Sequence, residues 1–144
     1  MLVIASIVLP LLAVGLHYEL LVLASHVVRV LSGSARAGVA LAVALALAAH
    51  VIEVAVFGIG WLALTRAGVV ELSIPSPTLA DAIYFSGAVY TSLGFGDIVP
   101  VGDGRFLAVL EAVTGLVLIA WTASFTLYQM REHRMDGADE IDGG

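Results

Sequence analysis

The sequence predicts an all-α membrane protein in which three long helices span the bilayer and a shorter helix and loop re-enter it. Of the 144 residues, 60% are hydrophobic and only 12% are charged, which is typical of membrane proteins rather than of water-soluble domains. Three apolar runs each exceed the roughly 20 residues that a helix needs to cross the hydrocarbon core. We therefore expect contact with membrane lipid. The net charge of −6 argues against a nucleic-acid partner, and the absence of Cys excludes disulfides.

Residues 1–35 are predicted to form an N-terminal membrane helix, at 2–31, and a short polar turn. The run has no basic segment at its start and no small-residue cleavage site before His17, so we interpret it as a retained helix rather than a signal peptide. Pro10 lies inside this run and is expected to kink the helix.

Residues 36–130 are predicted to form a second unit, which begins with a membrane helix at 37–64 and ends with another at 104–130. Arginines lie next to the polar turn and after the last helix, at Arg29, Arg36, Arg131 and Arg134. Because positive charges collect on the cytoplasmic side of a membrane, we expect the N-terminus outside and the C-terminus in the cytoplasm. The sequence thus predicts a multi-pass protein of a bacterial inner (plasma) membrane.

The segment between the last two membrane helices is expected to lie on the external side. Residues 65–78 contain two prolines and are predicted to form an exposed loop. A short helix is predicted at 79–90, with Thr78 or Ser76 as its N-cap and Asp81 in its first turn. The following residues, 91–97, contain two glycines that can adopt positive φ angles. This loop can enter the membrane only where it is buried in protein or lines water.

Residues Tyr90 to Pro100 read Tyr-Thr-Ser-Leu-Gly-Phe-Gly-Asp-Ile-Val-Pro and resemble the pore loop of the tetrameric potassium-channel superfamily. The closest pattern is the small bacterial type with two transmembrane helices, here with one extra N-terminal helix. The resemblance implies a homotetramer, in which the carbonyls of four chains replace the hydration shell of K⁺. The implied filter residues are Ser92, Leu93, Gly94, Phe95 and Gly96, and K⁺ is held by the first four of them. It implies K⁺ as the permeant ion and no cofactor.

Five residues are predicted to support this filter: Thr91, Asp97, Tyr84, Phe85 and Glu111. In the family, the acid after the filter forms a hydrogen bond behind it, and Tyr84 is the expected partner of Asp97. The family's filter Tyr is replaced by Phe95, for which Phe85 is the expected apolar neighbour. A rise of about 1.5 Å per residue places Glu111 near the level of the short helix, which we expect it to brace. Ala88 stands where some relatives carry a bracing Glu.

The last membrane helix is predicted to line a central cavity. Helical spacing places an apolar set on one face, and the cavity and gate residues are predicted to be Gly115, Leu116, Ile119, Ala123 and Leu127. Leu127 is the expected narrow ring at the inner mouth. Gly115 lies where the family often has a hinge glycine, and close helix packing is an equally good explanation for it.

Ionisable residues lie inside the first two apolar runs, among them His17, Glu19, His50 and Glu53. Such groups are unfavourable in a membrane and should face protein or water. Their predicted depths allow contacts between the two helices, so we favour a structural hydrogen-bonded network. A pH-sensing role is a second interpretation. A metal site or proton relay is a third interpretation, and the lack of a third ligand with motif spacing and of any Cys argues against the metal.

The sequence thus indicates a potassium-selective channel and no enzymatic activity. The alternatives are a poorly selective monovalent cation channel and a non-conducting scaffold or sensor subunit that retains the pore fold. An intramembrane metalloenzyme is more remote, since it would have no need of the filter pattern. Trp61 is expected to anchor its helix at the interface, and Trp121 to pack within the membrane. Residues 131–144 are predicted to form a disordered acidic tail.

Overall fold

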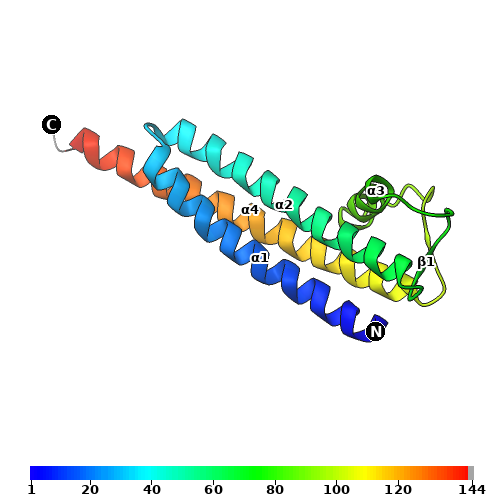
Figure 1. The fold of residues 1–144 in the computed structure, drawn as a ribbon. Coiled ribbons are helices and arrows are strands. Elements are labelled where there is room, and N and C mark those ends of the chain that lie inside the picture. The colour runs from blue at the N-terminus through cyan, green and yellow to red at the C-terminus, as the bar shows by residue number, and fades with distance from the viewer. Residues whose placement is uncertain (143–144) are drawn as a thin grey trace.

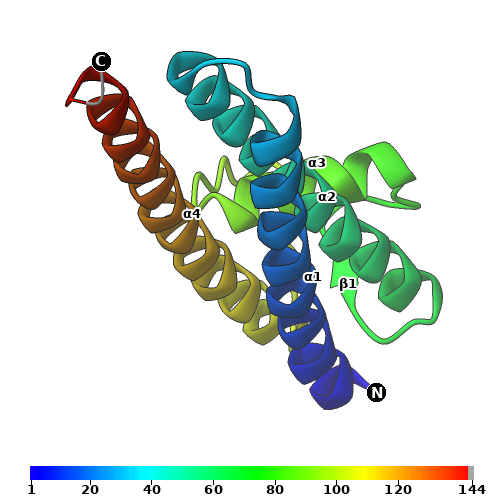
Figure 2. The same cartoon turned by 90° about the vertical axis from the view of Figure 1, so that its left-hand side faces the viewer.

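The computed structural model describes residues 1–142. Within them the chain forms four helices and two short strands, in the order α1 (Leu2–Leu31), α2 (Ala35–Arg66), β1 (Glu71–Leu72), α3 (Leu79–Tyr90), β2 (Pro100–Val101) and α4 (Gly104–Asp142). Helices α1, α2 and α4 run side by side along a long bundle, and α3 lies beside them toward one end (Figure 1). The N-terminus lies at that end, and the last turns of α4 lie toward the other, as does the turn between α1 and α2 (Figure 2).

Helices α1, α2 and α4 are, among the described residues, the three that are long and apolar enough to cross a membrane. This finding confirms a mostly helical fold with three candidate spans. On α1 the buried positions recur every three or four residues, at Ala13, His17, Leu21, Ala24 and Val28. The opposite face is apolar and exposed, which is the distribution expected where lipid rather than water surrounds a helix.

The connection between α2 and α4 is more ordered than the predicted loop. Strands β1 and β2 pair antiparallel, with Glu71 opposite Val101. This pairing joins the start of the segment, after α2, to its end, before α4. Thr78 is the N-cap of α3: its Oγ1 accepts from the Asp81 backbone N–H at 3.2 Å, and Asp81 Oδ2 accepts from the Thr78 N–H at 2.9 Å. This reciprocal capping box satisfies donors that the first turn leaves unpaired, so α3 has a defined start.

Two buried clusters hold the elements together. One contains Trp61, Leu64, Val70, Leu72, Phe85 and Leu107. The other contains Ala13, Phe57, Tyr90 and Leu118. The prediction that Trp61 is an interfacial anchor was wrong, since this side chain is fully buried and meets Phe85 edge-on, with ring centroids 4.9 Å apart. Such an aromatic pair contributes about 0.5–1.5 kcal/mol beyond its buried area.

Helix α4 continues to Asp142, through a segment that the sequence predicted to be disordered from residue 131. The physical reason for the difference is that the segment follows a long helix directly. Elongation adds one hydrogen bond per residue and needs no new nucleus, so acidic composition alone does not end a helix. Arg131 to Met135 also contains mainly good helix formers.

Candidate functional site

The loop at 91–97, which we call the glycine loop, has positive φ at every second residue. The angle is 57° at Ser92, 53° at Gly94 and 81° at Gly96. The two glycines adopt this left-handed conformation without a steric penalty because they lack a Cβ. Ser92 is a non-glycine residue in the same region, which the sequence did not predict.

The start of the glycine loop is held by the last turn of α3. Thr91 Oγ1 donates to the carbonyl of Gly87 at 2.7 Å, and the Gly94 N–H donates to the carbonyl of Ala88 at 2.9 Å. The Leu93 and Phe95 side chains are exposed in the single chain. The loop is therefore fixed to its helix by hydrogen bonds to the backbone carbonyls of α3, and the Leu93 and Phe95 side chains have little contact within one chain.

The end of the glycine loop is tied to α3 by an exposed hydrogen bond. The Tyr84 hydroxyl donates to Asp97 Oδ2 at 2.8 Å, the pairing expected from the sequence, and this bond holds the pKa of Asp97 below its ordinary value. The Phe95 ring stacks parallel to Tyr84, with centroids 6.2 Å apart. The expected neighbour, Phe85, packs on Trp61 instead, because successive residues of a helix point about 100° apart.

Glu111 is fully buried and joins three helices. Trp61 Nε1 on α2 donates to Glu111 Oε2 at 2.6 Å, and Ser86 Oγ on α3 lies 2.5 Å from Oε1. Ser86 Oγ also lies 2.9 Å from the carbonyl oxygen of Val54. The contact with α3 is the one expected for Glu111. Nothing in the sequence indicated Trp61 as its partner, because a Trp near a helix end resembles an interfacial anchor.

Gly115 lies where α4 packs directly against the end of α3. A Cβ built on Gly115 would be 2.0 Å from the carbonyl oxygen of Tyr90. This geometry favours the packing explanation for the glycine. The other proposed cavity residues lie on a different face of α4, where Leu116, Ile119, Ala123 and Leu127 are all exposed in the single chain. That face is free to meet other chains or a pore.

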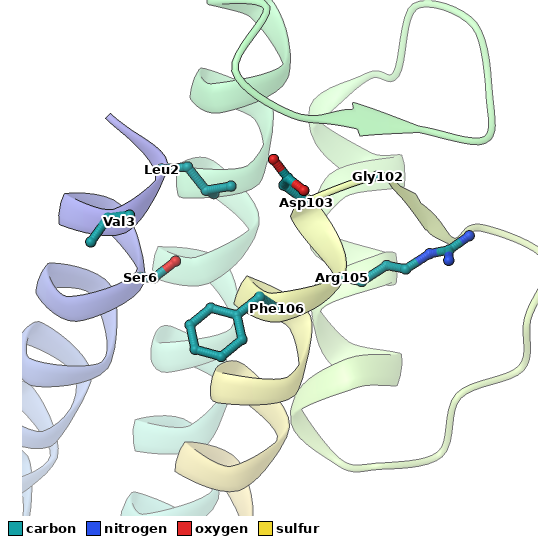
Figure 3. Close-up of a pocket in the computed structure, with 7 residues that line it drawn as sticks. All are labelled: Leu2, Val3, Ser6, Gly102, Asp103, Arg105 and Phe106. Carbon is teal, nitrogen blue, oxygen red and sulfur yellow. The ribbon is translucent and has the colours of Figure 1, made fainter.

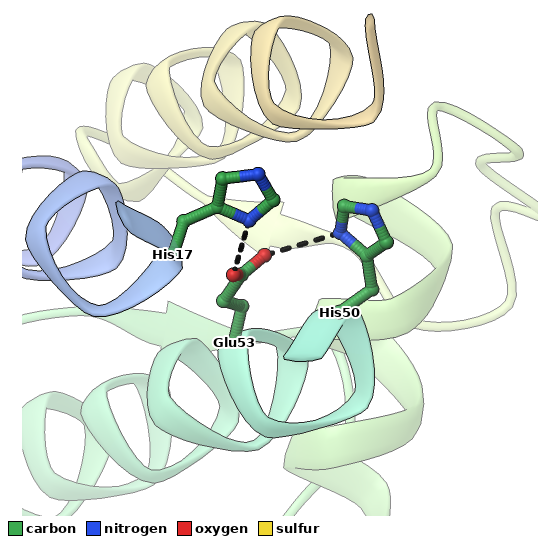
Figure 4. Close-up of side chains that lie close together, drawn as sticks. All are labelled: His17, His50 and Glu53. Carbon is green, nitrogen blue, oxygen red and sulfur yellow. Dashed lines mark hydrogen bonds and ion pairs between the residues drawn. The ribbon is translucent and has the colours of Figure 1, made fainter. Parts of the chain in front are cut away.

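A buried polar cluster, which we call the histidine cluster, joins all four helices. It contains His17, His50, Glu53, Tyr90 and Thr122, and Figure 4 shows its two histidines and the carboxylate between them. His17 Nδ1 lies 2.7 Å from Glu53 Oε1, and His50 Nδ1 lies 3.1 Å from Oε2.

The remaining contacts of the cluster come from α3 and α4. The Tyr90 hydroxyl donates to Glu53 Oε2 and lies 2.9 Å from His50 Nδ1. Thr122 Oγ1 lies 2.9 Å from His50 Nε2 and 3.4 Å from His17 Nε2. Sequence reasoning missed Tyr90 and Thr122, since neither residue type is unusual in an apolar helix.

Glu19, predicted to join the same network, is exposed instead. Residues two positions apart in an α-helix point about 200° away from each other, so His17 and Glu19 cannot share the buried face of α1. The atoms of His17, His50 and Glu53 that can bind a metal all lie within 4.8 Å of one another. These three are the described residues best placed to hold an ion.

An open pocket of about 420 Å³ lies between the starts of α1 and α4 (Figure 3). It is lined by Leu2, Val3, Ser6, Gly102, Asp103, Arg105 and Phe106. The buried Ser6 Oγ has no hydrogen-bond partner among the described residues. The pocket is a hollow of the bundle surface, and its lining is mainly apolar.

A family model described as an ion channel matches residues 49–132, more than half of the chain. The chain belongs to this ion-channel family. The match takes in the later part of α2, all of α3 and the glycine loop, and α4 as far as residue 132. Together with its long apolar helices, membership of the ion-channel family makes the chain a multi-pass membrane protein.

Two curated relatives are similar to part of the chain. Protein LctB of Bacillus caldotenax is 38% identical over 56 residues, which cover 39% of this chain and 41% of that protein. Protein LctB of Geobacillus stearothermophilus is 40% identical over 50 residues, which cover 35% of this chain and 37% of that protein. The chain thus spans about two-fifths of the length of these curated relatives. No solved structure matches the chain.

Proposed function

We propose that the chain is the subunit of a potassium-selective channel that conducts K⁺ passively down its electrochemical gradient. The observation that carries the proposal is the left-handed backbone at Gly94 and Gly96, on a loop that directly follows a short capped helix in a member of the ion-channel family. Such a backbone lets successive carbonyls share one direction, instead of alternating as in a strand. A ring of carbonyls can then replace the water around a dehydrated ion.

The proposed assembly is a homotetramer, because one chain supplies a single glycine loop and a ring requires several. The exposed side chains of Leu93 and Phe95 and the exposed apolar face of α4 support this, since both would be covered by neighbouring chains or would face the pore. Four glycine loops around one axis would place α3 behind the filter and α4 around the cavity.

The proposed location is a bacterial inner membrane, with the glycine loop at the outer side and residue 131 at the cytoplasmic side. The N-terminus and the β1–β2 segment lie at one end of the bundle, and the turn between α1 and α2 lies at the other (Figure 1). Arg36 is in the first turn of α2, directly after this turn. The arginines at the turn and at the end of the spanning part of α4 support this direction.

The experiment that tests the proposal is reconstitution of the purified chain in lipid bilayers with different K⁺ and Na⁺ concentrations on the two sides. A reversal potential near the K⁺ equilibrium value is expected. Equal permeability to the two ions would instead identify a poorly selective cation channel, and the absence of any current would identify a scaffold or sensor subunit. The mass of the particle in lipid, measured in the same preparation, is expected to be that of four chains.

A further inference from the structure

We propose that the histidine cluster is a binding site for one divalent transition-metal ion of the zinc class, with His17, His50 and Glu53 as ligands. The sequence argued against a metal because it offered only two neighbouring ligands on α2. The fold supplies the third ligand, His17, from α1, and this residue lies 36 positions earlier in the chain than Glu53. This proposal goes beyond the channel function and does not depend on it.

The three ligands already surround one point. Both Nδ1 atoms face the same carboxylate, at 2.7 Å from His17 and 3.1 Å from His50, and all three ligand atoms lie within 4.8 Å of one another (Figure 4). The Tyr90 hydroxyl lies beside the same carboxylate and 2.9 Å from His50 Nδ1, in the place of a fourth ligand. An ion of this class takes four ligands at about 2.0–2.2 Å, so small side-chain rotations are sufficient to admit it.

The donor set selects the class of ion. Two neutral imidazoles and a carboxylate suit Zn²⁺, whereas Ca²⁺ and Mg²⁺ require six or more oxygen ligands or retained waters. The chain has no Cys, so thiolate-dependent sites are excluded.

The negative charge of the buried Glu53 carboxylate is a further reason to expect a bound cation. His17 and Glu53 are fully buried, and the sequence from 37 to 65 contains no Arg or Lys that could neutralise the carboxylate. A buried carboxylate without a partner of opposite charge is unfavourable in a membrane. In this cluster the charge is compensated either by a protonated His17 or His50, which lie 2.7 and 3.1 Å from the carboxylate, or directly by a divalent ion.

Thr122 completes the arrangement from α4. Its Oγ1 lies near the Nε2 atoms of both histidines, at 2.9 Å from His50 and 3.4 Å from His17. When both Nδ1 atoms bind the ion, each neutral ring carries its proton on Nε2, and the two lone pairs of the Thr122 hydroxyl can accept both. Metal-binding histidines usually have such an acceptor behind them, which fixes the tautomer and the ring orientation.

The site is structural rather than catalytic. A catalytic zinc site keeps one position open for water or substrate, whereas here Tyr90 occupies that side. Bound metal would link α1 and α2 to the last residue of α3, directly before the glycine loop. Occupancy would therefore stabilise the attachment of α1 to the part of the chain that the ion-channel family model matches.

The test uses the full chain in lipid nanodiscs, equilibrated with Zn²⁺ and then freed of unbound metal. Elemental analysis of the wild type is expected to give one Zn²⁺ per chain, and X-ray absorption is expected to show nitrogen and oxygen ligands only. Adding a chelator is expected to lower the melting temperature. His50→Gln and Glu53→Gln are expected to lose the metal, and Thr122→Val to weaken binding by about 10–100-fold.

His26→Ala and Glu19→Gln are the matched controls, since both residues are exposed on α1 and outside the cluster. They are expected to retain one Zn²⁺ per chain. The proposal is overturned if the wild type retains no more metal than Glu53→Gln, or if His26→Ala loses as much metal as Glu53→Gln does. Either result would leave a hydrogen-bonded network only. Because the measurement needs no ion current, failure here is distinct from failure of the channel function.

Discussion

The carbonyl oxygen of Tyr90 occupies the space beside Gly115 that any larger residue would need, because a Cβ at position 115 would lie 2.0 Å from that oxygen. The obstacle is backbone and cannot rotate away. Since Tyr90 ends α3 and the glycine loop follows it, this contact sets how closely α4 can approach the loop.

Gly115→Ala is therefore expected to destabilise the protein, by about 1–3 kcal/mol if the helices separate slightly, as overpacking does in other cores. The melting temperature in detergent measures the effect. Gly15→Ala on α1 is the control, since a Cβ there meets nothing within 4 Å among the described residues. Equal stability of the two variants would contradict the close contact and favour a hinge at Gly115.

Glu111→Ala is expected to destabilise the protein because it removes the acceptor of the buried Trp61 Nε1–H and the neighbour of Ser86. Leaving a buried donor unpaired costs about 1–3 kcal/mol. Glu111→Gln can accept from Trp61 and donate to Ser86, so it is expected to retain most of the stability. Thermal unfolding of both variants distinguishes the hydrogen bonds from the charge, and a Gln variant as unstable as Ala would show that the charge itself is required.

Gly94→Ala is expected to abolish K⁺ current, because the residue has a φ of 53° that a Cβ makes unfavourable. Gly68→Ala is a closely matched control: Gly68 has a φ of 68°, and neither glycine has an atom within 4 Å of its built Cβ among the described residues. The two changes thus impose similar backbone strain, one in the glycine loop and one outside it. Current that survives in both, or disappears in both, would argue against a specific role of the loop backbone.

The bond between Tyr84 and Asp97 predicts a sensitivity to external acid. The Tyr84 hydroxyl lowers the pKa of Asp97, so the stabilisation is complete above the ordinary Asp pKa of about 3.9 and is lost as the pH falls through the lowered value. In Tyr84→Phe the pKa of Asp97 returns toward its ordinary value, and the acid loss of current is expected at higher pH. Tyr18→Phe, at an exposed position on α1, is expected to behave as the wild type. Identical acid midpoints in all three proteins would exclude this role.

Leu127→Cys is expected to make the current sensitive to a charged thiol reagent added on the cytoplasmic side, because Leu127 lies on the proposed pore face of α4. The chain has no native Cys, so each engineered thiol is unique in its chain. Leu23→Cys is the control, since Leu23 is similarly exposed but lies on α1. Block of the Leu23 variant with no effect on the Leu127 variant would reverse the assignment of the pore-facing helix.

The sequence was sufficient to predict features that depend on local pattern. Three apolar runs indicated three long helices, and a cap at Thr78 or Ser76 with Asp81 in the first turn indicated the start of α3. The depth of Glu111 placed it near α3. Features that depend on helix rotation in three dimensions were not predictable in this way. Glu19 and His17 looked equivalent in an apolar run, and only the packing of α1 shows that one is buried and the other exposed.

The chain has two tryptophans, and the structure gives them different surroundings. Trp61 is fully buried and bonded to a carboxylate, whereas Trp121 is 38% exposed and its ring centroid lies 5.3 Å from that of His17. Intrinsic fluorescence of the unlabelled protein therefore carries two separate signals. Replacing either tryptophan by Phe leaves an optical reporter of one region alone: Trp61 for the junction of α2, α3 and α4, and Trp121 for the docking of α1.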